Sequence, residues 1–238
     1  MPKELDPPPE PSRKDKAIAI GTAAARGTLG IVPYLAEVFD LLWRQPIEKR
    51  REEWLRDVGD AIHHLQDRQA ALTPENLAKD QRFVTVLHRA TDFAMRTHEE
   101  EKRRALRNAI LNSAGPTAPD LDRQLFFLRL IDDLSVNQVL ILELFRDPRG
   151  WFAKRQIKPQ EFSSASRHEV LRQAYPQLAE HPHLKELVIA ELQRRGLMGD
   201  IGTLMTGSGI WQPATTKIGH EFIDFISRPE QDSTATRA

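Results

Sequence analysis

The chain has 238 residues, long enough to bury a sizeable core, and its 40% hydrophobic and 29% charged side chains exclude a disordered chain. Its 34 basic and 34 acidic side chains cancel, which excludes a global field that would draw the protein onto nucleic acid or an anionic membrane. Cysteine is absent, which excludes disulfides and thiol catalysis and fits a reducing, cytoplasmic location.

The two ends of the chain are predicted to be disordered tails. Residues 1–16 are charged and rich in proline, and residues 229–238 are rich in Ser, Thr and charge. Neither stretch carries enough apolar surface to offset the entropy that folding costs. The N-terminal residues also lack the charge order and cleavage site of a secretory signal, so none is expected.

Residues 17–45 are predicted to be an apolar, glycine-containing helical segment. Arg26, Gly27, Gly30 and Pro33 interrupt it, whereas a membrane span needs about 20 predominantly apolar residues. Two short helices are therefore expected, either as a buried hairpin that closes the core or as a reversible membrane contact. The side chains that would contact a membrane or a partner are Ile18, Ile20, Leu29, Ile31, Tyr34 and Trp43.

Residues 46–134 are predicted to form a helical domain. Pro46 suits the first position of a helix, and apolar residues then recur every three or four positions. Thr73 marks the start of another helix, and Thr97 with Glu100 predicts a capping box. The basic run at 102–107 follows three glutamates, so it is interpreted as a solvated helix face. Apolar residues at 121–134 predict a further amphipathic helix.

Residues 135–228 are predicted to form a winged-helix-like module with a small β-hairpin. Ser135 and Gln138 predict a capped helix that ends at Pro148, followed by a loop. A helix at 167–174, with a capping box from Ser166, precedes a second one whose stripe of 184, 187, 188 and 192 ends at Gly196. A glycine-rich stretch with strand-like runs at 203–206 and 210–212 then leads into a last helix at 216–226. The fold class is therefore expected to be all-α: a helical bundle followed by this module.

The predicted module raises the question of nucleic-acid binding. Its candidate contacts are Lys185, Arg194 and Arg195, because a recognition helix would enter the major groove and phosphate contacts need cations. Residues 199–215 contain neither Lys nor Arg, however, and Asp200 adds a negative charge. This charge distribution favours a protein partner or self-association over DNA.

No catalytic residue, cofactor or metal site is predicted. His181 and His183 lack a third ligand at suitable spacing, and His63 and His64 point to different parts of a helix. Gly207-Ser208-Gly209 lacks the strand–serine–helix frame of a hydrolase and is interpreted as a tight hairpin turn.

The layout of residues 70–227 resembles that of the bacterial abortive-infection alpha proteins. The resemblance rests on the helical N-terminal half, on the helical segment 128–144 that leads into a winged-helix-like end, and on a closing Thr-x-Ile-Gly-x-x-Phe motif that begins at Thr216. It implies a non-enzymatic bacterial protein linked to phage resistance, with no established catalytic residues. Residues 17–65 are not covered by it.

We expect from these patterns a cytoplasmic bacterial interaction or regulatory protein, related to phage defence, that acts by binding a protein and not by catalysis. Two alternatives stay open at this level. One is a membrane-associated effector that uses residues 17–43, and the other is a winged-helix DNA-binding regulator.

Overall fold

The structure is a computed structural model that describes residues 47–66 and 72–229. The chain divides into two units, Met1–Arg50 and Arg51–Ala238, and most described residues belong to the second. The predicted apolar segment at 17–45, its six candidate contact residues and both tails except Pro229 lie outside the described residues. In the part that is described, no helix has the length and hydrophobicity that a membrane span requires.

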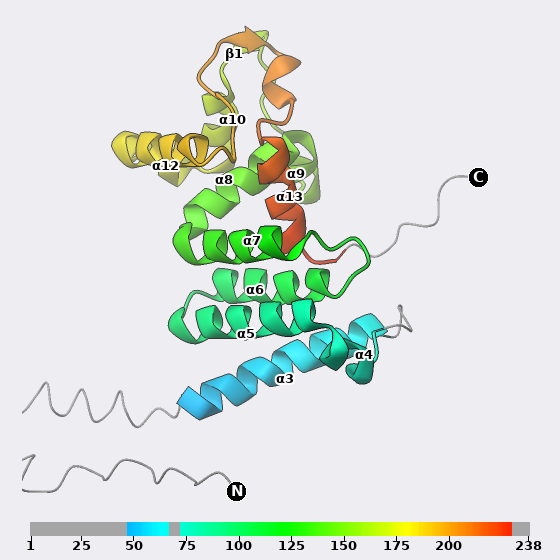
Figure 1. Ribbon diagram of the computed structural model, residues 1–238. Helices are drawn as coiled ribbons and strands as arrows, with labels where there is room; N and C mark the ends of the chain where they lie inside the picture. The colour runs from blue at the N-terminus through cyan, green and yellow to red at the C-terminus, as the bar shows by residue number, and fades with distance from the viewer. Residues whose placement is uncertain (1–46, 67–71, 230–238) are drawn as a thin grey trace, which may run out of the picture. The chain divides into compact units, whose positions relative to one another are not determined.

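The described residues confirm a predominantly helical protein, with eleven α-helices and one two-stranded antiparallel sheet (Figure 1). The helices are α3 (Ile47–Gln66), α4 (Pro74–Lys79), α5 (Gln81–Arg96), α6 (Glu100–Ser113), α7 (Leu121–Asp133), α8 (Val136–Arg146), α9 (Pro148–Lys154), α10 (Arg167–Ala174), α11 (Pro176–Ala179), α12 (Pro182–Arg194) and α13 (Lys217–Ile226). The strands are β1 (Ser164–Ala165) and β2 (Met205–Thr206), and a 3-10 turn, η1, covers Gly209–Trp211.

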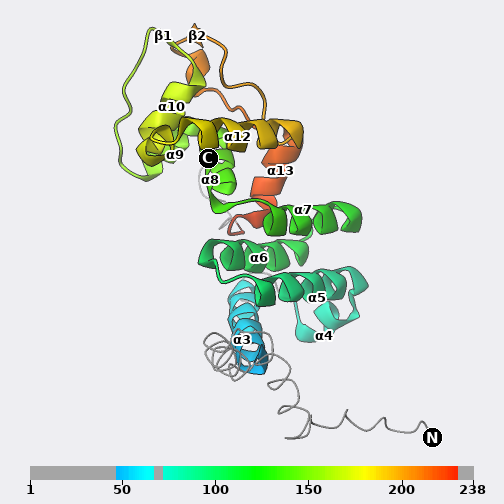
Figure 2. The same cartoon turned by 90° about the vertical axis from the view of Figure 1, so that its left-hand side faces the viewer.

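Helices α5, α6 and α7 pack as successive layers, and α3 lies across α5 (Figures 1 and 2). Trp54 of α3 is 1% exposed, and its Nε1 donates to the hydroxyl of Thr91 on α5 at 3.1 Å. The indole is thereby buried without an unsatisfied donor. The capping box predicted at Thr97 and Glu100 does not form. Thr97 ends α5 instead, and its hydroxyl accepts the N–H of Glu99.

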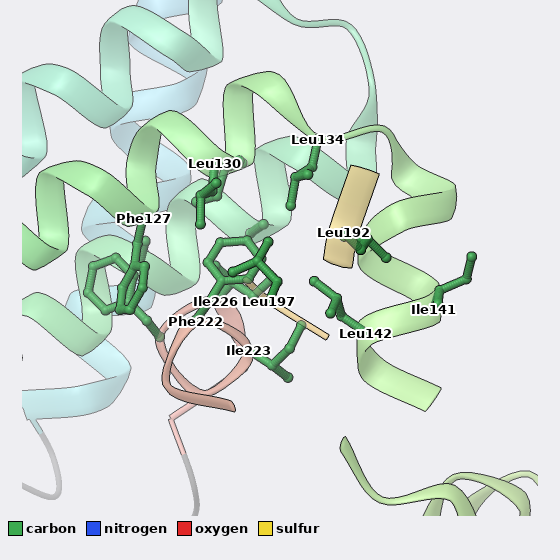
Figure 3. Packing of buried hydrophobic residues seen from close by; sticks show 14 of the residues in the cluster. Phe127, Leu130, Leu134, Ile141, Leu142, Leu192, Leu197, Phe222, Ile223 and Ile226 are labelled. Atoms are coloured by element: carbon green, nitrogen blue, oxygen red, sulfur yellow. The ribbon is translucent and has the colours of Figure 1, made fainter. Parts of the chain in front are cut away.

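Helix α8 is the centre of the C-terminal half. It contacts α9, α10, α12 and α13, and its residues Ile141, Leu142, Leu144 and Phe145 are all fully buried. Figure 3 shows side chains of α7, α8, α12 and α13 turned toward this shared interior. The predicted capping box of Ser135 and Gln138 is confirmed, so the buried helix begins with its backbone donors satisfied. A helix that is apolar on nearly every side must be covered by other elements, and the four neighbouring helices cover α8.

Two predictions at the end of α8 and before α10 are wrong in detail. Pro148 does not open a loop: it begins α9, because Asp147 accepts the N–H of Gly150 as an N-cap and proline fits the first helical position. Ser166 does precede α10 as predicted, but its side chain makes no capping bond.

The glycine-rich stretch after α12 does not form the predicted hairpin. Residues 203–206 supply only β2, which pairs with β1 and not with 210–212. Ile210 and Trp211 lie in η1, where both side chains are buried. Gly207 ends the ladder: a Cβ there would stand 2.0 Å from the carbonyl oxygen of Phe162, so only glycine allows this approach.

The Thr-x-Ile-Gly-x-x-Phe motif has a structural explanation. The hydroxyl of Thr216 accepts the N–H of Gly219 and donates to the carbonyl of Gly196, which caps α13 and attaches its start to the end of α12. Gly219 lies so close to Leu197 that a Cβ would meet its carbonyl oxygen at 2.0 Å. Phe222 is fully buried. Gly196 adopts the predicted left-handed conformation, with φ 70°.

Two asparagines of α6 hold the other end of α13. Asn108 Nδ2 donates to the carbonyl of Ile226 at 2.9 Å, and Asn112 Nδ2 donates to the carbonyls of Phe225 and Ser227, each at 2.8 Å. The last carbonyls of a helix have no partner within the helix, so these amides supply what the backbone cannot. They also join residues more than 110 positions apart in the sequence.

We expect Asn112→Ala to lower the free energy of unfolding by about 1–3 kcal/mol, because it leaves partly buried carbonyls without donors. Urea unfolding followed by circular dichroism measures the change. Asn137→Ala is the matched control, since Asn137 is exposed on α8 and makes no side-chain hydrogen bond to any described residue; its effect is expected within about 0.5 kcal/mol. Equal effects of the two substitutions would contradict the assigned role of Asn112.

Candidate functional site

Helix α12 presents an apolar side to solvent. Val188, Ile189 and Leu192 are buried, whereas Leu184 is 48% and Leu187 68% exposed. The helix that residues 184, 187, 188 and 192 predict is confirmed, but these four residues do not all lie on its buried side. Adjacent residues of a helix are rotated by about 100°, so burying Val188 turns Leu187 outward. Leu184 and Leu187 lie three positions apart and are neighbours on the helix surface.

The cations of α12 that were candidates for nucleic-acid contact are all paired with carboxylates. Lys185 lies 3.3 Å from Glu186, and Arg194 forms an ion pair with Glu191. Arg195 contacts Glu191 at 2.6 Å and Asp133 of α7 at 3.1 Å. Hydrogen bonds from Arg194 and Arg195 lower the pKa of Glu191, so the carboxylate stays charged at neutral pH.

Residues 199–215, which lie between α12 and α13, contain neither Lys nor Arg. The pKa of Asp200 is lowered first by a hydrogen bond from the hydroxyl of Thr203 and then by hydrogen bonds from the N–H groups of Gly202 and Thr203. Arg167 of α10 donates to the carbonyls of Asp200 and Gln212, which holds the two sides of the loop together. Leu204 in this loop is 72% exposed.

A second feature is the arginine-lined cleft between α3, α6 and the residues that follow α13. Two cavities of about 460 and 360 Å³ share Leu65, Leu111, Arg228 and Pro229 and so adjoin each other. The charged or titratable side chains that line the cleft are His64, Arg104, Arg107, Arg146, Asp224 and Arg228.

The basic run of α6 does not form the uniform solvated face that its sequence predicted. Lys102 Nζ donates to the carbonyl of Asp132 at 2.9 Å, near the C-terminal end of α7. The guanidinium of Arg103 lies over the Trp54 ring, 5.8 Å from its centroid. Arg104 and Arg107 line the cleft. The four neighbouring cations therefore lie in three different environments. In the sequence, only the spacing of three positions connects Arg104 with Arg107.

Glu143 of α8 is a partly buried carboxylate near two arginines. It lines a small cavity of about 30 Å³ with Arg104 and a larger one of about 220 Å³ with Arg155. Burial raises the pKa of Glu143, and the charges of Arg104 and Arg155 oppose that rise without cancelling it. No nucleophile is assigned beside it. Sequence patterns do not reveal this group, because the burial of one polar residue on an apolar helix depends on the elements packed around it.

Metal-ligating clusters are missing from residues 47–66 and 72–229, where no three His, Asp or Glu side chains gather to hold an ion. His181 and His183, at the start of α12, are both exposed. Comparisons of the chain with models of protein families, with curated proteins and with solved structures find no match.

We expect Glu143→Gln to raise stability at neutral pH and to leave it unchanged in acid. A carboxyl whose pKa is higher in the folded state binds more protons there, so the wild-type protein loses stability as the pH rises from the unfolded value of 4.5 through the raised folded value. Urea unfolding of both proteins across this pH range measures the difference. The exposed Glu180→Gln serves as the control, and a Glu143→Gln advantage that persisted unchanged in acid would contradict the assignment.

Proposed function

We propose that the chain is a non-enzymatic bacterial interaction protein that binds a protein partner through the exposed side of α12. The observation that carries this proposal is the exposure of Leu184 and Leu187 on α12. The candidate cations beside them, Lys185, Arg194 and Arg195, each form an ion pair with a carboxylate. Phosphate recognition needs available cations, whereas an apolar helix side suits a protein groove.

These two leucines offer apolar surface that a protein partner would bury. Full burial of a leucine contributes about 1.5–3 kcal/mol, and Leu184 and Leu187 leave 48% and 68% of their surface for a partner to cover. Leu187, the more exposed of the two, is the expected anchor.

The topology of the C-terminal half supports a winged-helix-like interpretation of this module. Helices α10 and α12 precede an antiparallel bridge between Met198 and Thr215, and the interpretation takes residues 199–214 as the counterpart of a wing, although they do not form a hairpin. In such a module α12 is the helix offered to a partner. The resemblance to abortive-infection alpha proteins supplies the biological setting of the proposal, which is phage resistance.

We expect Leu187→Ser to weaken partner binding about tenfold, the effect of removing roughly 1.4 kcal/mol of apolar burial. Sedimentation velocity of the purified chain detects a second copy as the partner. A different protein is identified by cross-linking from a photoreactive side chain at position 187 and is then titrated as a purified component. Phe126→Ser is the control, because Phe126 is 41% exposed on α7. Equal binding by the wild type and Leu187→Ser would reject the α12 surface.

We expect the protein not to bind duplex DNA in a salt-dependent manner, because Arg194 and Arg195 already bond carboxylates. Fluorescence anisotropy of a labelled duplex at low salt measures this. Binding that weakens with salt and is lost in Arg194→Ala or Arg195→Ala would instead support a winged-helix DNA-binding regulator.

A further inference from the structure

We propose that the arginine-lined cleft binds a small phosphate-bearing molecule. The first reason is its charge. Its described lining includes four arginines, Arg104, Arg107, Arg146 and Arg228, but only one carboxylate, Asp224. Asp224 forms an ion pair with Arg146, so it is already occupied.

Three guanidinium groups of the cleft form no ion pair with a described residue, although one of them, Arg104, is also attracted by Glu143 of the neighbouring small cavity. Arg104, Arg107 and Arg228 form no ion pair with any residue in the described ranges 47–66 and 72–229. Several arginines outside the cleft do form such pairs, as Arg123 does with Glu221 and Arg195 with Asp133. Several like charges beside one cavity repel one another, and an anion bound there would relieve that repulsion.

Two asparagine side chains reduce the repulsion between an anion in the cleft and the C-terminal end of α13. The C-terminal carbonyls of a helix carry partial negative charge, and α13 ends beside the cleft. The amides of Asn108 and Asn112 cover the carbonyls of Phe225, Ile226 and Ser227. The same bonds fix the chain directly before Arg228, which places that side chain next to α6.

The size and lining of the cleft favour a small molecule. Cavities of about 460 and 360 Å³ fall within the range of ligand pockets, roughly 300–1,000 Å³. Guanidinium groups donate two parallel hydrogen bonds to phosphate oxygens, so several arginines select phosphate over a single carboxylate. Leu65, Leu111 and Pro229 supply an apolar side that can contact the organic part of a phosphate ester.

The proposal does not depend on the α12 surface. Arg104 and Arg107 come from α6, three positions apart on the same side of the helix, and Arg228 follows α13. Sequence spacing alone brings together only the first two. The Leu187→Ser variant is therefore expected to bind phosphate as the wild type does, so the failure of one proposal can be told from the failure of the other.

The test is isothermal titration calorimetry of the full chain with inorganic pyrophosphate, AMP and ATP at constant ionic strength. We expect saturable binding by the wild type that is weakened about tenfold or more in Arg107→Gln and in Arg228→Gln, since each loses charge-assisted hydrogen bonds. Arg129→Gln is the control: Arg129 is exposed on α7, outside the cleft, and forms no ion pair with a described residue. Thermal unfolding without ligand verifies that the variants are folded.

The three ligands distinguish the source of the phosphate. Equal affinity for pyrophosphate and ATP indicates that the phosphate groups alone are recognised, and tighter binding of AMP or ATP indicates a phosphate ester whose organic part contacts the apolar side. Absence of saturable binding to all three overturns the proposal. Equal weakening by Arg129→Gln, which indicates diffuse attraction, also overturns the proposal. The same holds if the chain binds anionic phospholipid vesicles or duplex DNA but none of the three ligands.

Discussion

The packing of α13 against both α6 and α8 is the contact on which the rest of the described structure depends. This last helix carries Phe222 and Ile223 into the shared interior, and its two ends are held by different partners. Thr216 attaches its start to the end of α12, and the two asparagines of α6 satisfy its final carbonyls. Because α13 contacts elements from both halves of the sequence, the bundle and the C-terminal module share one core.

The same packing decides how the arginines are used. On α12, Lys185 and Arg194 form ion pairs with carboxylates, and Leu184 and Leu187 remain exposed. Beside the end of α13, Arg107 and Arg228 line the same cavity although they are far apart in sequence, and Asp224 forms an ion pair with Arg146. The zero net charge of the chain does not reveal this difference between α12 and the cleft, because a net charge says nothing about where the charged side chains lie.

Much of the helical architecture could be predicted from local patterns. The helix 167–174, the start of α13 at Thr216, the capping box at Ser135 and the left-handed Gly196 all depend on residues within one or two turns of each other. Predictions failed where a distant segment decided the outcome. Strand β2 pairs with β1, some forty residues earlier, because that segment satisfies its backbone, and this leaves Ile210 and Trp211 to be buried in η1.

The sequence by itself determined that the chain is helical, where most helices begin and end, and that a thiol or disulfide has no place in its chemistry. Periodicity and capping depend on residues that are close in the sequence, so they can be predicted from the sequence. Only the tertiary structure decided that Leu184 and Leu187 face solvent, that Glu143 is partly buried, and that arginines from α6 and from beyond α13 line one cleft. Exposure and charge pairing depend on which distant elements cover a side chain, and that is a property of the packed fold.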